Sequence, residues 1–154
     1  MQRREVLKAG FGLGVFGTLV GAGVLQPRLV LAARSQENAF KATKLDEALK
    51  ALGADGAQVS DQIVLGAPDI AENGAVVPIE IESKIPNTEA IALFIDKNPN
   101  ALSAFFQFTP EALPRVKTRV KMGQSSDVVA VVKAGGKYYM TKKEVKVTLG
   151  GCGG

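Results

Sequence analysis

Apolar and polar residues alternate along much of the chain beyond residue 60, as they do in strands that bury one face. In the segment 75–82, for example, three β-branched residues share one face while Glu80 and Glu82 share the other. Similar short apolar or alternating runs stand at 63–66, 90–96, 103–109, 115–121, 127–133, 137–140 and 144–149. Turn-forming pairs, Asn73-Gly74 and Gly135-Gly136, separate some of these runs. The pattern predicts seven to eight short strands, mainly antiparallel, in an all-β sandwich or barrel.

One stretch ahead of the strands has helical spacing instead. Between Phe40 and Leu52, the apolar residues Leu45, Ala48 and Leu49 recur at the intervals of an amphipathic helix. A glycine follows directly at position 53, and glycine commonly ends helices. We therefore expect one short N-terminal helix before the β-domain.

The N-terminal segment has the layout of an export signal. Arg3 and Arg4 precede an uncharged run at 9–27, and small or medium-sized residues follow at 30–32. The paired arginines indicate the twin-arginine type, although Val6 stands where many such signals carry Phe. A retained transmembrane anchor is the alternative, because about 20 apolar residues span a bilayer. Six glycines dilute the hydropathy of this run, so cleavage near residue 32 is the favoured interpretation.

This segment changes how the charge of the chain is understood. The 154 residues carry a net charge of +4, but residues 1–32 hold four basic side chains and one acidic one. The remainder is therefore nearly neutral and gives no electrostatic reason to expect nucleic-acid binding. Twin-arginine signals export folded proteins, so we expect folding in the cytoplasm and a final location in the periplasm. Contact with the membrane would be limited to export.

Composition also limits the chemistry of the chain. Histidine is absent, which removes the commonest general base and metal ligand and every Ser–His or Cys–His catalytic pair. The single cysteine, Cys152, can form neither an internal disulfide nor a thiolate metal cluster. We expect no metal, no cofactor and no enzymatic activity of the chain's own.

The most informative feature is the C-terminus. Four glycines surround the one thiol: Gly150, Gly151, Cys152, Gly153 and Gly154. Because glycine loses the most backbone freedom on ordering, this segment is expected to be a flexible arm, reaching about 17 Å when extended. A thiol on a slim tether suits a carrier whose cargo is bonded at sulfur. Nothing nearby in the sequence activates the thiol, so any activation would come from partner enzymes.

Other interpretations of this tail stay open on composition alone. Terminal glycine-rich tails are often simply disordered, and an odd cysteine in an exported protein often forms an intermolecular disulfide. Cys152 could then join chains of a structural module. Chains ending in Gly-Gly can also carry sulfur as a thiocarboxylate, here on Gly154, but such carriers are shorter, cytoplasmic and β-grasp in fold.

Several motifs together are similar to one known family. The chain resembles the SoxY family, the sulfur-carrier subunits of bacterial thiosulfate oxidation. The resemblance covers most of residues 40–154, and its motifs are 71–78, 85–88, 97–99, 119–124 and 145–154. A terminal Gly-Gly-Cys-Gly-Gly is highly specific to this family when it closes the chain.

The resemblance implies a fold and a function. It implies an immunoglobulin-like antiparallel β-sandwich at 33–149, between the signal peptide at 1–32 and the carrier arm at 150–154. It implies a heterodimer with a SoxZ-type subunit and covalent attachment of sulfur at Cys152. A haem cytochrome would couple thiosulfate to the thiol, and a manganese hydrolase would release sulfate. A sulfane dehydrogenase, where one is present, would act on the sulfur that remains.

Charged residues on two predicted strands have simpler explanations. Glu80 and Glu82 are expected on a solvated strand face, being two residues apart. Four cations at every second position, Arg115, Lys117, Arg119 and Lys121, predict another solvated face. A stripe of one sign could also dock partners or steer anionic thiosulfate.

Overall fold

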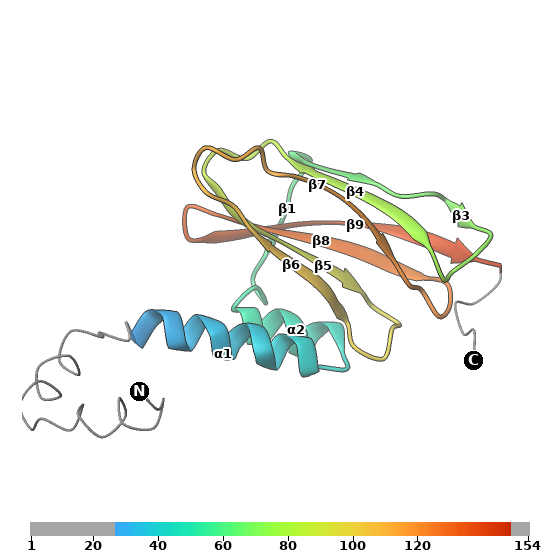
Figure 1. Cartoon of the computed structure of the whole chain (residues 1–154), viewed down its shortest axis with the longest axis horizontal. Coiled ribbons are helices and arrows are strands. Elements are labelled where there is room, and N and C mark those ends of the chain that lie inside the picture. The colour runs from blue at the N-terminus through green and yellow to red at the C-terminus, as the bar shows by residue number, and fades with distance from the viewer. Residues whose placement is uncertain (1–26, 149–154) are drawn as a thin grey trace, which may run out of the picture. The chain divides into compact units, whose positions relative to one another are not determined.

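A computed structural model describes residues 27–148 of the protein. Most of the secondary structure in this range is β-strand (Figure 1). The chain divides after Ala33 into two units, and the β-domain belongs to the second. No helix within residues 27–148 combines the length and the hydropathy needed to cross a bilayer.

Two sheets form the β-domain, as the sequence predicts. The larger sheet has the order β1-β9-β8-β5-β6, with β3 also paired to β9, and the smaller sheet has the order β2-β4-β7. The strands are β1 (Gln58–Val59), β2 (Ile63–Gly66), β3 (Ile70–Ala71), β4 (Val77–Ser83), β5 (Thr88–Ile95), β6 (Leu102–Gln107), β7 (Arg115–Val120), β8 (Ser126–Ala134) and β9 (Lys137–Val147). All pairings are antiparallel except those of β1 and β3, which run parallel to β9.

The main core lies between the two sheets. Ile79 and Ile81 of β4 point inward and are almost fully buried, with Leu93 of β5 and Val128 of β8 in the same cluster. The alternation predicted for β4 is therefore confirmed. Burial of such side chains is the dominant favourable term in folding, and it fixes which face of the smaller sheet remains in water.

The other face of the larger sheet is also covered. Phe94 of β5 and Val129 of β8 pack in a second cluster with Ala48 and Leu49 of helix α2 (Leu45–Leu52). The hydroxyl of Tyr138 donates to the carbonyl of Leu52 at 2.8 Å and ties α2 to β9. Burial on both faces explains why β5 and β8 are nearly continuous apolar runs.

The helical region differs from the prediction in number and extent. Two helices precede the strands, α1 (Pro27–Lys41) and α2, where the sequence predicts one helix from Phe40 to Leu52. Phe40 belongs to the last turn of α1. This helix was missed because its first residues, 27–32, fall in the segment interpreted as an export signal, and a polar run at 34–38 follows them. Ala39 is the buried residue of α1 among those whose side chains are described. The predicted end is confirmed, since Gly53 adopts φ 75° and caps α2.

The hairpin between the last two strands is as predicted, but the final strand is longer. Gly135 and Gly136 both have positive φ, 56° and 73°, which the tight turn requires and glycine adopts at little cost. The runs at 137–140 and 144–149 belong to one strand, β9, which continues to Val147. Only two residues therefore separate the end of β9 from the predicted arm at 150–154.

Candidate functional site

The predicted attachment site itself lies outside the described residues. This holds for Cys152 and for its flanking glycines, Gly150, Gly151, Gly153 and Gly154, and also for the signal residues Arg3 and Arg4. The structure describes the chain up to Thr148. The described part of the candidate site is the segment that leads into the predicted arm, called the arm root (Val145–Thr148).

The arm root is held on one side by β3. Ile70 and Ala71 pair in parallel with Lys146 and Val147. The backbone N–H of Thr148 donates to the carbonyl of Ala71 at 3.1 Å, and its hydroxyl donates to the carbonyl of Glu72 at 3.1 Å. The last described residue is thus fixed by two hydrogen bonds through its backbone and its side chain.

The loop between β7 and β8 also holds the arm root. The N–H of Val147 donates to the hydroxyl oxygen of Ser125 at 2.9 Å. In the same loop, the N–H of Met122 donates to the carbonyl of Gly74 at 2.7 Å, and the Met122 side chain is fully buried. The loops after β3 and after β7 therefore meet beside the end of β9, at the right-hand end of Figure 1.

Asn98 fixes the conformation of that loop. Its side-chain amide donates to the carbonyl of Lys121 at 2.7 Å, and its side-chain oxygen accepts from the N–H of Gly123 at 3.3 Å. The segments 97–99 and 119–124, which are separate motifs in the sequence, are thus joined in space. We call this end of the sandwich, formed by residues 69–74, 121–125 and the arm root, the arm end.

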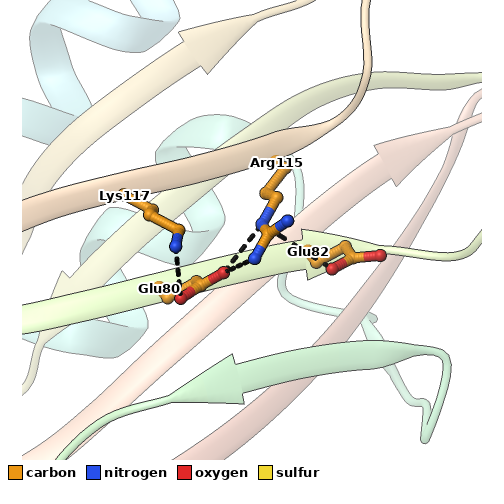
Figure 2. Close-up of polar contacts among 4 residues, drawn as sticks. All are labelled: Glu80, Glu82, Arg115 and Lys117. Atoms are coloured by element: carbon orange, nitrogen blue, oxygen red, sulfur yellow. Dashed lines mark hydrogen bonds and ion pairs between the residues drawn. The ribbon is translucent and has the colours of Figure 1, made fainter.

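The smaller sheet brings together the two charged patterns predicted on separate strands. In the register of β4 with β7, Glu80 lies opposite Lys117, and Glu82 opposite Arg115. Figure 2 shows Arg115 and Lys117 both directed at Glu80. Arg115 Nε donates to Glu80 Oε1 at 2.7 Å, and Lys117 Nζ lies 3.3 Å from Glu80 Oε2. The predicted solvated faces are thus one exposed cross-strand cluster of ion pairs.

This cluster affects the ionisation of its members. The hydrogen bond from Arg115 is the main reason that the pKa of Glu80 lies below its ordinary value, and the same bond raises the pKa of Arg115. Glu82 adds a longer contact to Arg115 Nε at 3.8 Å. Exposed pairs of this kind contribute little to stability. They do compensate the charge of two of the four cations in the stripe, Arg115 and Lys117.

A depression on the smaller sheet includes two members of this cluster. It has a volume of about 710 Å³ and is lined by Gly66, Ala67, Pro68, Pro78, Ile79, Glu80, Lys117, Thr118 and Arg119. The depression exists because β2 ends at Gly66 and the chain then turns away to β3, so Pro78 of β4 has no neighbour from β2. Arg119 pairs with Pro78 across the strands and so stands at this depression.

Sequence reasoning missed the contacts that hold the arm root. β3 has only two residues, too few to show a periodicity. Ser125 and Asn98 act through loops, where hydrogen-bonding side chains are common and their partners are set by tertiary structure. Among residues 27–148, no group of three or more Asp, Glu, His or Cys residues is placed to hold a metal ion.

Comparison with known proteins gives a clear set of similarities. A family model described as sulfur oxidation protein SoxY matches residues 49–152. The solved structure of the sulfur carrier protein SoxY from Chlorobium limicola f thiosulfatophilum is 41% identical, with a TM-score of 0.63, over 73% of this chain and 98% of that one. The superoxide reductase (neelaredoxin) from Ignicoccus hospitalis has a TM-score of 0.53 at 16% identity, over 59% of this chain and 94% of that one. The latter likeness concerns the fold alone. No curated protein sequence matches the chain.

Proposed function

This chain belongs to the SoxY family of sulfur oxidation proteins, and we propose that it carries sulfur intermediates covalently on the thiol of Cys152 during thiosulfate oxidation. One observation carries the proposal most directly. The family match extends to residue 152, so the region shared with the family includes the single cysteine. The hydrogen-bonded arm root gives the segment that bears this thiol a fixed point of attachment.

In this proposal the thiol is the site of attachment and partner enzymes perform the chemistry. A haem cytochrome removes two electrons and one proton as the Cys152 thiol and thiosulfate join through a new S–S bond, which gives a cysteine S-thiosulfonate. A manganese hydrolase then adds water and releases the terminal sulfonate as sulfate, which leaves a persulfide.

The persulfide is the branch point of the sequence. A sulfane dehydrogenase would remove six electrons from the outer sulfur while three water molecules supply its oxygens, which gives an S-sulfonate. A second hydrolysis would release sulfate and regenerate the thiol. The chain needs no cofactor of its own in this sequence, because each electron leaves through a partner.

The location and the immediate partner belong to the same proposal. Export by the twin-arginine route would deliver the folded protein to the periplasm, where thiols are not kept reduced. A SoxZ-type subunit would form the heterodimer with this chain and could travel with it. Delivery of an attached substrate to several enzymes suits a chain whose thiol lies beyond the body of the domain.

Intact mass measurement tests the proposal. Protein isolated from thiosulfate-fed cells should carry sulfur and sulfonate adducts on Cys152, and reduction should remove them. Cys152→Ser should keep the fold and abolish both the adducts and thiosulfate oxidation. Thiosulfate oxidation that persists in this variant would refute the proposal. A permanent protein–protein disulfide at Cys152 would point to the structural module instead, and an adduct at Gly154 to a thiocarboxylate carrier.

A further inference from the structure

The sheet edges of the β-domain differ in how they are protected. An unpaired edge strand offers a row of backbone N–H and C=O groups to a strand of any other chain, and proteins guard such edges with charges, proline or short strands. β1 and β3 have two residues each, and β2 has four. β7, the edge of the smaller sheet, carries the basic residues Arg115, Lys117 and Arg119. All of these edges are therefore guarded.

β6, the edge of the larger sheet beyond β5, lacks these protections. It pairs with β5 on one side and with no strand of the described range 27–148 on the other. From Leu102 to Gln107 it contains no charged residue and no proline. An irregularity in register affects only its beginning, opposite Leu93 and Phe94. From Ala104 onward, β6 is thus a regular, uncharged and unpaired edge.

The free side of β6 presents backbone hydrogen-bonding groups. The N–H of Phe108, just after the strand, donates to the carbonyl of Glu89 at 2.9 Å, on the side of β5. Because backbone groups alternate in direction along a strand, the N–H and C=O groups of Phe105 and Gln107 are directed away from β5. Another extended strand offers donors and acceptors at the matching interval, so a strand is the natural partner of this edge.

The side chains of β6 also leave room for a neighbour. Successive side chains point to opposite faces, so Phe106 packs against the main core while Phe105 packs against the second cluster, which includes α2. Both rings are only half-buried, whereas Leu93 and Phe94 of the adjacent β5 are fully buried. A strand beside β6 would cover the exposed parts of both rings through cross-strand contacts.

The neighbouring edge indicates the charge of the partner. Phe106 packs against the cluster that includes Val116 and Val120 of β7, so a strand added to β6 lies on the same side of the sandwich as β7. Arg119 and Lys121 on that side are exposed and form no ion pair with any residue of the range 27–148. Acidic side chains would complement them, whereas a second copy of this chain would bring like charges together.

We infer that β6 is the docking edge of this chain for a partner subunit, whose own edge strand extends the larger sheet and whose acidic side chains face Arg119 and Lys121. The inference rests on the proposed function for the identity of that partner, a SoxZ-type subunit, and adds the surface that receives it. In such strand addition, main-chain hydrogen bonds supply the affinity and side chains supply the specificity.

Amide hydrogen exchange tests this surface without any substitution. The full chain is measured alone and after co-purification with a SoxZ-type subunit. The amides of Phe105 and Gln107 should exchange at least about tenfold more slowly in the complex, because their N–H groups become bonded to the added strand. The amides of β2, at the opposite edge of the smaller sheet, should keep the rates of the free chain.

A proline at the end of β6 tests the backbone contact. Gln107→Pro removes an N–H that is directed away from β5, a place where an edge strand tolerates proline. It should raise the Kd of the complex about two- to tenfold, as expected for one hydrogen bond. Gln107→Ala keeps the N–H and is the matched control, with an unchanged Kd. A urea titration of each free variant checks that the fold is kept.

Charge reversal tests the second part of the inference. Arg119→Glu and Lys121→Glu should each slow association with the partner severalfold at an ionic strength of about 0.01 M, and much less at about 0.5 M, where the attraction is screened. Lys137→Glu makes the same change in net charge at the hairpin between β8 and β9. It is the matched control and should leave the association rate unchanged.

A complex that forms without protection of Phe105 and Gln107 would overturn the inference. The same holds if folded Gln107→Pro binds with the wild-type Kd, if β6 pairs with a second copy of this chain in the presence of the partner, or if no complex forms. Should Gln107→Pro fail to fold, the exchange measurement on the wild-type chain still decides. None of these results concerns sulfur at Cys152, which the adduct measurement tests separately, so the two failures are distinguishable.

Discussion

The hydroxyl of Ser125 is expected to determine how firmly the arm root is held. It accepts the N–H of Val147 at 2.9 Å from a loop 22 residues away in sequence. Ser125→Ala removes this acceptor while the pairing of β3 with β9 and both bonds of Thr148 remain. A hydrogen bond of this kind contributes about 0.5–1.5 kcal/mol net. Because Val147 is only half-buried, water can replace part of the lost bond, and about 0.5–1 kcal/mol is the expected cost.

Amide hydrogen exchange measures this cost at the residue concerned. Local opening governs exchange at the ends of strands, and about 1.4 kcal/mol corresponds to a factor of ten. The Val147 amide should therefore exchange about two to five times faster in Ser125→Ala. Amides in the centre of β8, such as that of Val131, should keep the wild-type rate, since the loss is local.

Ser60→Ala is the matched control for this measurement. The hydroxyl of Ser60 also accepts a backbone N–H, that of Gln62 at 3.2 Å, but in an exposed turn before β2. It should leave the exchange of Val147 unchanged. An unchanged Val147 rate in folded Ser125→Ala would refute the reasoning, because the strand pairing alone would then hold the arm root. A uniform rise in all amides would refute it as well, since Ser125 would then support the whole domain.

Other expected outcomes concern the body of the domain. Tyr138→Phe removes the donor to the Leu52 carbonyl and should lower the free energy of unfolding by about 0.5–1.5 kcal/mol in a urea titration; an unchanged midpoint would mean that α2 is held by packing alone. Phe94→Ala empties a fully buried position and should cost about 3–5 kcal/mol in the same assay, so a loss below about 1 kcal/mol would contradict the described core. The pKa of Glu80 is lowered from 4.5 in the folded state by Arg115, so its contribution to stability is present above that value and is lost as the pH falls through the lowered pKa. Glu80→Gln should remove this acid-side loss in thermal melts, and a variant with the wild-type pH profile would assign the loss to other carboxylates.

The smaller sheet was the part of the fold most accessible to prediction. One face of β4 lies in water, so its side chains alternate, and Ile79 and Ile81 are buried as expected while Glu80 is directed outward. The periodicity predicts faces but not register. The pairing of Glu80 with Arg115 depends on which residues of β4 and β7 lie opposite each other, and tertiary structure decides that.

Other elements carry a weaker local signal. β5 and β8 are apolar on both faces, so the sequence predicts strands there but does not indicate that α2 covers one side. β1 and β3 have two residues each, and their position is set by a partner strand far along the chain. A polar run at 34–38 interrupts the apolar residues of α1, so its helical spacing is obscured. The roles of Cys152 and its glycines stay predictions, because these residues lie outside the described range.

If the chain functions as proposed, a fixed arm root determines where a partner enzyme has to bind. Because Thr148 is held at the arm end, Cys152 can act only within about 14 Å of it, plus the length of its own side chain and cargo. A partner that receives the cargo must therefore approach the loops at 69–74 and 121–125 and not the opposite hairpin.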